Sequence, residues 1–404
     1  MKHLRRYIVA AVVVLVAAGV HAQSGSGSSP ISGSAQVVDI PGGKLRVVTV
    51  ATGLFHPWSL GFLPDGRLLV AERDGKLRII GKDGVMSPDV VWTSPTPSGQ
   101  GRDALHGLAV HPKFAQNQLV YMSYPKNGPK GNTLAISRGH LQGGKLTELA
   151  EIFVADAWET SGNLAGHMMF GPDSTLYVMV GDRDRLCCTG TEDNSLRMKA
   201  QALDNHIGKT LRLTDAGGVP ADNPFVGKAG TKPEIYTYGH RNGYGLSFNP
   251  ETGQLWQAEI GPMGGDEVNI LLPGHNYGWP LVSMGRNYTG SLASDQPWYR
   301  PGMDNPRMFW VPSISPSSIL WYTGDKFPQW KNSLFVGALT TRQLLRISFG
   351  QPSQAERREP LLASLNLRIR DVQQSPDGYI YVATEGAIRG DAADGMVLRL
   401  EPAN

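Results

Sequence analysis

The stretch FLPDGRLLVAERDGKLRII, residues 62–80, contains the pattern that decides the fold. Pro64 restricts φ at the first position of a turn, and Asp65-Gly66 supply the tight reversal that a β-hairpin needs. Apolar and polar residues then alternate, as they do along a strand with one buried face. The stretch therefore predicts a hairpin that joins two half-buried strands.

Five later segments repeat this arrangement of an apolar residue, a polar turn and an alternating strand. They are AVHPKFAQNQLVYMSY (109–124), FGPDSTLYVMVGDR (170–183), FNPETGQLWQAEIGP (248–262), WKNSLFVGALTTRQLLRI (330–347) and QSPDGYIYVATE (374–385). The first two turn prolines, Pro64 and Pro112, are 48 residues apart, a period typical of propeller blades. We therefore predict an all-β fold, a six-bladed β-propeller formed by residues 37–404.

The ring is expected to close by pairing between segments from the two ends of the chain. VVDIPGGKLRVVTV (37–50) and GMVLRLE (395–401) are the candidates, and pairing them in one blade would remove an open edge that is prone to aggregation. A pair of β-sandwiches is the alternative all-β architecture, but it gives no reason for six similar hairpins.

The first 22 residues have the features of a secretory signal peptide, with a basic start, the apolar run 8–20 and small residues before a cleavage site at Ala22. An uncleaved membrane anchor is less favoured, because this run is too short to span a bilayer of about 30 Å. Residues 23–36 are rich in Gly and Ser and predict a flexible linker. We therefore expect a periplasmic or secreted protein with no integral membrane segment after cleavage.

Signal cleavage would also change the charge of the 404-residue chain. It would remove Lys2, Arg5 and Arg6 and no acidic residue, so that the 38 basic and 35 acidic residues become 35 of each. A chain without net charge is not expected to bind nucleic acid. The two cysteines, Cys187-Cys188, are adjacent and cannot build a disulfide scaffold. Whether they form a strained vicinal disulfide is left open.

Three long segments point to a family. They are GLFHPWSLGFLPDGRLLVAERDGKLRII (53–80), GHRNGYGLSFNPETGQLWQAEIGPMGGDEVNILLPGHNYGWP (239–280) and RIRDVQQSPDGYIYVATE (368–385). Together they resemble the soluble quinoprotein sugar dehydrogenases, also called the glucose/sorbosone or aldose sugar dehydrogenase family. The resemblance covers essentially the whole mature chain. It implies a six-bladed propeller, export to the periplasm, pyrroloquinoline quinone held with calcium over the central channel, and oxidation of an aldose to its lactone.

The resemblance assigns several arginines to the quinone. Arg241-Asn242 in GHRNGYG match the pair that contacts the cofactor, and Arg368 and Arg370 in RIRDV match a pair that faces cofactor and substrate. Fixed guanidinium groups suit an anionic quinone whose reduced form carries more charge. Each pair has an alternative interpretation as a basic surface turn or strand end. Asp371 is a candidate for orienting the second pair.

Calcium is expected where the family uses main-chain oxygens. Gly261-Pro262 in EIGPMGGDE match the two carbonyls that hold the ion beside the quinone, where it would act as a Lewis acid. A second, structural calcium is expected at Glu267 and the carbonyl of Tyr277. The alternative for the GDE segment is an ordinary polar turn.

Departures from the family concern the base and one cofactor contact. The family's general-base His falls at Asn163, eight residues before Gly171, and amides do not accept a proton at neutral pH. His167 is the nearest imidazole and the first candidate for a relocated base, with His106 as the second.

A family Lys that reaches the quinone is replaced by Thr340, and Arg342 is a candidate to restore its charge because it shares a strand face with Thr340. The family's Gln falls at Arg102, with Gln100 two places away.

These features predict an exported oxidoreductase, like a sugar dehydrogenase that depends on pyrroloquinoline quinone and Ca²⁺. It would transfer a hydride from a sugar-like alcohol or hemiacetal to the quinone. No CxxCH motif for haem is present, so the electrons would pass to a separate acceptor. Two alternatives remain: a redox-inactive propeller that binds a sugar or a partner, and a calcium-dependent hydrolase or lactonase.

Overall fold

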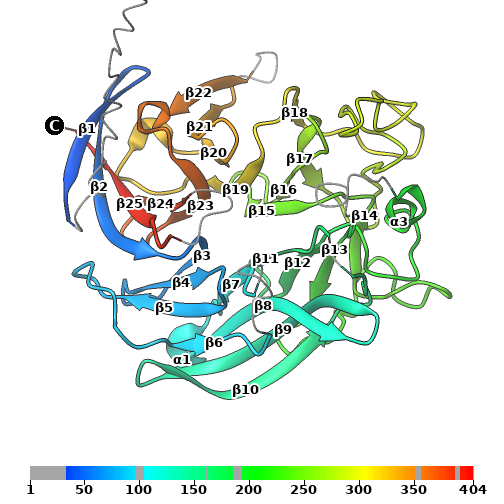
Figure 1. The fold of residues 1–404 in the computed structure, drawn as a ribbon, viewed down its shortest axis with the longest axis horizontal. Helices are drawn as coiled ribbons and strands as arrows, with labels where there is room; N and C mark the ends of the chain where they lie inside the picture. The colour runs from blue at the N-terminus through cyan, green and yellow to red at the C-terminus, as the bar shows by residue number, and fades with distance from the viewer. Residues whose placement is uncertain are drawn as a thin grey trace, which may run out of the picture.

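The computed structural model describes residues 33–96, 104–160, 162–184, 193–350, 356–386 and 392–403. Its strands form six antiparallel sheets arranged around a central axis (Figure 1). The predicted all-β, six-bladed propeller is confirmed. Within the described residues, no helix has both the length and the apolar character needed to cross a membrane.

Each of the first five blades contains four strands in chain order from the centre outward. Blade 1 contains β3 (Pro57–Phe62), β4 (Leu68–Glu72), β5 (Lys76–Ile80) and β6 (Trp92–Thr93). Blade 2 contains β7 (Gly107–Val110), β8 (Leu119–Gly128), β9 (Gly131–Gln142) and β10 (Lys145–Val154). Blade 3 contains β11 (Ala165–Phe170), β12 (Leu176–Val180), β13 (Lys209–Leu213) and β14 (Ile235–Tyr238).

The remaining blades follow the same plan, and the last one takes strands from both ends of the chain. Blade 4 contains β15 (Gly243–Phe248), β16 (Leu255–Glu259), β17 (Asp266–Leu271) and β18 (Met308–Trp310). Blade 5 contains β19 (Pro316–Trp321), β20 (Leu334–Ala338), β21 (Gln343–Ser348) and β22 (Arg357–Leu361). Blade 6 contains β23 (Arg368–Gln374), β24 (Ile380–Glu385), β25 (Gly395–Pro402), β2 (Gly43–Leu54) and β1 (Ala35–Ile40).

The ring closes as predicted. β2 pairs antiparallel with β25, from Leu45 opposite Pro402 to Leu54 opposite Gly395. The edge of β25 is therefore covered by the N-terminal hairpin, and β1 begins at Ala35, two residues before the predicted start of the propeller.

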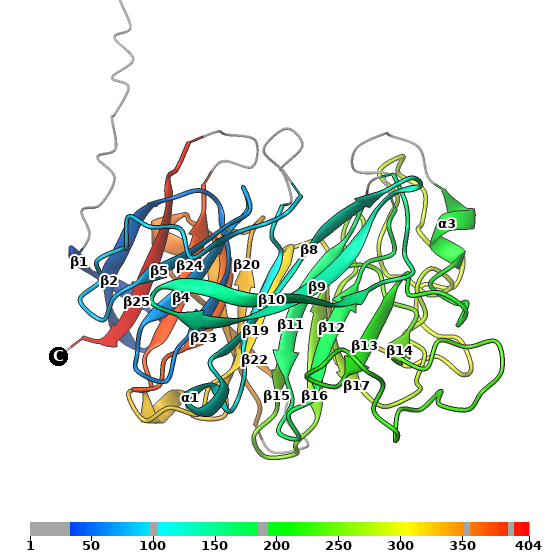
Figure 2. The ribbon, with the colours of Figure 1, turned by 90° about the horizontal axis from the view of Figure 1, so that it is seen from below.

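The repeated turn lies between the first and second strands of a blade. In the first copy, Gly66 N donates to Leu63 O at 2.9 Å, and Gly66 has φ +88°, a conformation that favours glycine. The short helix α1 (Phe114–Asn117) replaces this simple turn in blade 2. Seen from the side, α1 and α3 (Asn194–Met198) lie on opposite faces of the ring (Figure 2).

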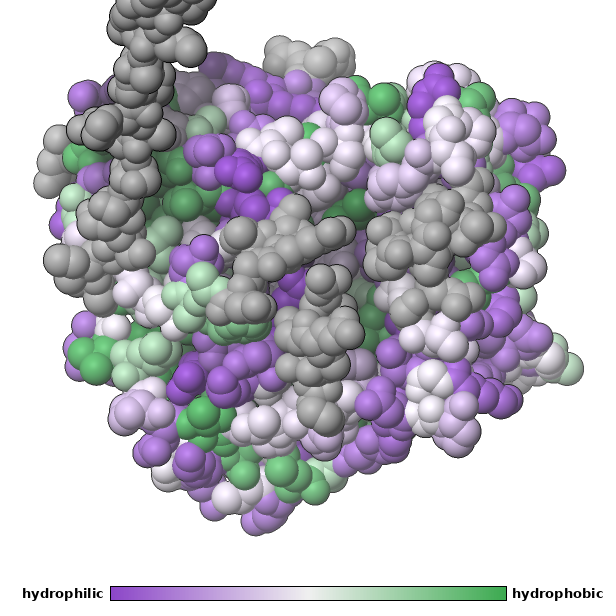
Figure 3. All heavy atoms as spheres, viewed as in Figure 1, coloured by the Kyte–Doolittle hydropathy of each residue, from purple (hydrophilic) through white to green (hydrophobic). Residues whose placement is uncertain are grey.

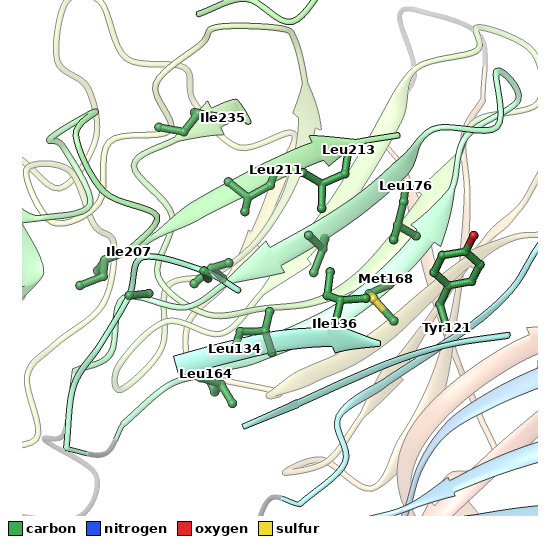
Figure 4. Close-up of a cluster of buried hydrophobic side chains, with 14 of the residues drawn as sticks. Tyr121, Leu134, Ile136, Leu164, Met168, Leu176, Ile207, Leu211, Leu213 and Ile235 are labelled. Atoms are coloured by element: carbon green, nitrogen blue, oxygen red, sulfur yellow. The ribbon is translucent and has the colours of Figure 1, made fainter. Parts of the chain in front are cut away.

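Apolar clusters between neighbouring blades hold the ring together. Within the described residues, each of the six blade interfaces has a cluster of buried side chains from both blades. The cluster between blades 2 and 3 includes Tyr121, Ile136, Met168 and Leu211 (Figure 4). Burial of apolar area at about 25 cal/mol per Å² is the main force that stabilises such packing. The rigid ring fixes the positions of the loops that precede the inner strands.

Candidate active site

The innermost strands of the six blades begin on the face that carries α3, and their starts surround the central channel (Figures 1 and 2). We call this end of the channel the mouth. Each inner strand brings one residue at or next to its start: Trp58, His106, Asn163, Asn242, Ser315 and Arg368. In the space-filling view of this face, hydrophilic and hydrophobic side chains are interspersed (Figure 3).

Five of the six inner strands have a register shift near their starts, and β7 is the exception. The pairing register shifts between Pro57 and Ser59 in β3, and corresponding shifts occur in β11, β15, β19 and β23. Trp58, Tyr244 and Arg370 are the extra residues in β3, β15 and β23. A bulge redirects its extra side chain. Strict alternation along the strands would point these three large side chains apart, but the bulges make them converge. Trp58 contacts Arg370 at 4.0 Å and Tyr244 at 6.1 Å, measured to ring centroids.

Four charged side chains form the centre of the site, and we call them the arginine cluster: Arg73, Arg368, Arg370 and Glu385. The Glu385 carboxylate accepts hydrogen bonds from Arg370 Nη2 at 2.5 Å, Arg368 Nη2 at 3.2 Å and Arg73 Nη1 at 3.2 Å. Burial alone would raise the pKa of Glu385, but the charges of Arg370 and Arg368 lower it to about 2. One carboxylate thus faces three guanidinium groups, and the cluster keeps a positive charge.

Asp371 has a different role from the one expected. Its carboxylate accepts Leu60 N and Ser318 Oγ, both at 2.7 Å, and so ties β23 to β3 and β19. No hydrogen bond among the described residues joins it to Arg368 or Arg370. The residue that orients these arginines is Glu385, from the neighbouring strand β24, because its side chain lies opposite Arg368 in the pairing register.

Arg241 links the mouth to the expected calcium loop. Its Nη1 donates to the carbonyls of Ile260 and Gly261, both at 2.8 Å. Gly261 O, one of the two expected calcium ligands, therefore already faces a cation. Asn242 Nδ2 donates to Tyr244 Oη at 3.2 Å, whereas Asn242 Oδ1 is buried without a hydrogen-bond partner among the described residues.

Asp266 holds the Gly261-Pro262 loop in place. This fully buried carboxylate accepts Gly261 N at 3.0 Å, Ser313 Oγ at 2.7 Å and Ser315 N at 2.9 Å. It thereby connects the loop before β17 to the segment before β19. Ser315 Oγ in turn lies 2.7 Å from Thr340 Oγ1, so the replaced Lys position is tied to the same network.

The residues expected at a structural calcium lie next to a second acidic group. Glu259 and Glu267 are directly opposite each other on β16 and β17, and Asn269 Nδ2 donates to both carboxylates at 2.7 and 3.1 Å. Burial, and then the charge of Glu259, raise the pKa of Glu267 well above its usual range. The Tyr277 hydroxyl donates to Ile270 O at 2.6 Å, which brings this residue against β17. Asn269 Oδ1 is a further buried oxygen without a hydrogen-bond partner among the described residues.

Asn163 contacts a buried acid that the sequence analysis did not single out. Asn163 Nδ2 donates to Asp182 Oδ1 at 2.9 Å, and Trp279 Nε1 donates to Asp182 Oδ2 at 2.8 Å. The Trp279 ring also lies 5.6 Å from the Arg241 guanidinium carbon. Asn163 and Arg241 are therefore joined through Trp279 and Asp182.

The two candidate histidines lie in different surroundings. His167 lines a cavity of about 340 Å³ at the far ends of the inner strands, together with Phe62, Phe170 and Gln374. Burial lowers its pKa, and Asp371 is the charge that opposes this shift. His106 is nearer the mouth, with its ring 5.4 Å from that of Trp58. The structure thus groups His106, and not His167, with the mouth residues.

Arg342 does not lie on a strand, so the expected alternation with Thr340 does not apply. Residues 339–342 connect β20 to β21, and Arg342 is exposed with φ +51°. Burial lowers the pKa of Arg368, and the charges of Arg370 and Arg342 add to that shift. Gln100, Arg102, Cys187 and Cys188 lie outside the described residues.

Comparison with known proteins assigns the family. The model for the glucose/sorbosone dehydrogenase family matches residues 54–396. The chain belongs to this family. It is 36% identical to the aldose sugar dehydrogenase YliI of Escherichia coli over 368 residues, which cover 89% of this chain and 94% of the relative. It is 28% identical to the quinoprotein glucose dehydrogenase B of Acinetobacter calcoaceticus, covering 86% of this chain and 87% of the relative.

A solved member of the family has the same fold. The structure of the aldose sugar dehydrogenase from Streptomyces coelicolor in its PQQ-bound form superimposes with a TM-score of 0.69 at 28% identity, covering 93% of this chain and 99% of that one. These comparisons confirm the resemblance seen in the sequence. They support a sugar dehydrogenase-like oxidoreductase that uses pyrroloquinoline quinone.

The sequence alone did not identify several of the residues at the mouth. Trp58, Tyr244 and Glu385 come from quoted motifs, but their inward position depends on the bulges and on cross-strand pairing. A large aromatic residue at the second place of an inner strand, as in PWS and GYG, is the signal that would have found Trp58 and Tyr244, whereas Glu385 lies at the end of β24 and carries no such signal. Asp182 follows the strand in VMVGD and offered no comparable local pattern.

Proposed function

We propose that the protein is an exported, calcium-assisted quinoprotein that oxidises an aldose or a similar sugar to its lactone at the mouth. The observation that carries the proposal is the arginine cluster. Three guanidinium groups share a single carboxylate there, and a fourth, that of Arg241, precedes the inner strand of blade 4. An anion with several carboxylates is the ligand that such a site recognises.

The state of individual nitrogen atoms supports a bound anion. Nε of Arg241, Arg368 and Arg370 is buried in each case and has no hydrogen-bond acceptor among the described residues. Leaving a buried donor without an acceptor costs about 1–3 kcal/mol. Pyrroloquinoline quinone, with three carboxylates and two quinone oxygens, would supply acceptors to these groups.

Calcium fits the oxygen donors nearby. The described residues contain no group of three or more His, Cys, Asp or Glu side chains that could hold a metal, so carbonyl and amide oxygens would have to complete the ligand set of a bound ion. Gly261 and Pro262 would supply carbonyls beside the quinone, as Ca²⁺ prefers. Glu267 and Tyr277, with Glu259 and Asn269, would hold the second ion. When bound, the quinone would accept the hydride and calcium would polarise its carbonyl group.

Residues of the chain itself would bind and orient the cofactor. Arg368 and Arg370 would bind the cofactor and stabilise its reduced form, and Trp58 would hold Arg370 in place by its 4.0 Å contact. Arg241 and Asn242 would fix the opposite side of the cofactor. Residues 1–22 would direct export before removal, and the electrons would pass from the quinone to a separate acceptor.

Calorimetric titration of the purified protein with pyrroloquinoline quinone, with and without Ca²⁺, tests this proposal. Tight binding that requires Ca²⁺ and weakens at least 30-fold in Arg368→Ala is the expected result. The matched control is Arg212→Ala, which removes an ion-paired arginine of blade 3. No quinone binding with Ca²⁺ present would contradict the proposal and favour a redox-inactive propeller.

A further inference from the structure

Asp182 is a buried carboxylate at the mouth whose two oxygens are both hydrogen-bonded. Oδ1 accepts Asn163 Nδ2 at 2.9 Å and Asp184 N at 3.0 Å, and Oδ2 accepts Trp279 Nε1 at 2.8 Å. The side chain is fully buried. It follows the end of β12 and cannot itself reach a sugar in the mouth, so any exchange with a substrate must pass through a neighbour.

Asn163 is that neighbour. It precedes β11 and is half-buried, whereas Asp182 lies behind it. A Cβ added to Gly181 would lie 2.3 Å from Asn163 O and 3.1 Å from Asn242 Oδ1, so the three segments are in close contact at the mouth. Asn163 Nδ2 donates its hydrogen bond to Asp182. The amide oxygen, Asn163 Oδ1, is therefore available as an acceptor, and no described residue donates to this oxygen.

We propose that Asp182 is the final acceptor of the proton that leaves the substrate hydroxyl, and that the Asn163 amide carries the proton to it. The inference rests on the function proposed above. The C–H bond would break with its two electrons leaving as hydride to the quinone. The hydroxyl proton would pass to Asn163 Oδ1 in the same step as an Nδ2 proton passes to Asp182 Oδ1, so the amide never holds an additional proton. A carbonyl forms, Asp182 becomes neutral, and Asn163 is left for a moment as its imidic acid tautomer.

The electrostatics of the site favour this direction of transfer. Burial raises the pKa of Asp182; the charge of Arg241 opposes the shift and that of Asp184 adds to it. Asp184 is itself neutralised by the buried Arg197, at 2.7 Å. Trp279, which closes the other side of Asp182, has no titratable group. A carboxylate that holds a proton more firmly than usual is a better acceptor from a hydroxyl group.

The proposal separates this protein's proton path from His167, the first candidate for a relocated base. His167 lines the cavity at the far ends of the inner strands. No hydrogen bond or ring contact within the described residues connects it to Arg370 or Trp58. The path through Asn163 and Asp182 needs no imidazole, which accounts for an amide at the position where a base is expected.

Stopped-flow reduction of the bound quinone by an aldose tests the path in Asp182→Asn, Asn163→Leu, the double variant and Asn163→His. We expect Asp182→Asn and Asn163→Leu each to slow reduction at saturating sugar at least 100-fold without changing quinone affinity. The double variant should be no slower than either single variant. Asn163→His should be active, with an acidic limb of its pH profile typical of imidazole. Asp222→Asn, an exposed carboxylate of blade 3, is the control.

An infrared titration of the cofactor-free protein gives an independent readout. The band of a protonated carboxylic acid should persist above the pH at which ordinary Asp side chains ionise, and it should be absent from Asp182→Asn. The proposal is overturned if Asp182→Asn or Asn163→Leu reduces the quinone within threefold of the unmodified protein, or if the losses of the two variants multiply. If no sugar reduces the quinone in the unmodified protein, the proposed function fails, and the proton path fails with it.

Discussion

The guanidinium carbon of Arg370 lies 4.0 Å from the centroid of the Trp58 ring, and the same guanidinium group binds Glu385. Trp58 also lies 5.1 Å from the guanidinium carbon of Arg73, so its ring is flanked by two cations of the arginine cluster. Stacking on an aromatic face and bonding to a carboxylate both require a flat guanidinium group. The mouth therefore holds Arg370 in one orientation before any ligand arrives.

Arg370→Lys should weaken quinone binding, because an ammonium group cannot stack flat on Trp58, bind Glu385 and still offer the Nε donor that Arg370 has free. We expect a loss of about 30- to 100-fold in affinity, or about 2–3 kcal/mol. Isothermal calorimetry measures it. Arg399→Lys, in strand β25 of the same blade, is the matched control and should bind as the unmodified protein does. Equal affinities for the Arg370 variant and the control would contradict a role for this residue in the cofactor site.

Glu385→Gln should destabilise the fold, because it leaves three guanidinium groups around a neutral amide. Breaking a buried ion pair by removing one partner costs about 3–5 kcal/mol. Urea unfolding measures the loss. Glu401→Gln, which removes a less buried partner of Arg46 and Arg399, should cost less than about 1 kcal/mol. Equal losses of unfolding free energy in the two variants would show that Glu385 stabilises the fold no more than the more exposed Glu401 does.

The stability of the cofactor-free protein should fall in acid through Glu385. Its folded-state pKa of about 2 lies below the ordinary value of 4.5, so the stabilisation is present above pH 4.5 and is lost as the pH falls through 2. A shift of this size is equivalent to roughly 3 kcal/mol. Urea unfolding from pH 6 to pH 2 measures it. The decrease should be smaller by this amount in Glu385→Gln, and an unchanged decrease would refute the assignment.

Calcium should stabilise the fold through Glu267 even without the quinone. Glu259 and Glu267 are opposed on neighbouring strands, where Asn269 Nδ2 donates to both carboxylates and leaves their negative charges close together. Binding to the folded state alone raises stability by about 2.7 kcal/mol at a hundredfold excess over Kd. Thermal unfolding with Ca²⁺ and with a chelator measures the effect. Glu267→Gln should abolish the difference, whereas Glu251→Gln on the same blade should retain it.

The fold was predictable because its signal is repeated. Six hairpin turns, of which Pro64-Asp65-Gly66 is the first, each mark a blade, and tertiary packing agrees with the local pattern. The closing pairing between β2 and β25 followed from the need to cover an edge strand.

The site was predictable in part. Arg241, Arg368 and Arg370 were recognised by motif, and the structure brings Arg368 and Arg370 together on Glu385. Glu385 and Asp182 were not found, because their contacts with Arg368 and Asn163 depend on the pairing register of β23 with β24 and on the turn that follows β12. Arg342 was placed on a strand by its spacing, yet it lies in a turn with φ +51°, a local conformation that alternation does not reveal.

The most direct test of the account is anaerobic reduction of the reconstituted protein by a panel of aldoses, followed through the absorption of the quinone. The account predicts that at least one aldose converts the bound quinone to the quinol in a single turnover, yields the corresponding lactone in equal amount, and requires Ca²⁺. A quinone that binds tightly but stays oxidised with every aldose and sugar alcohol would contradict the assignment of this protein as a sugar dehydrogenase.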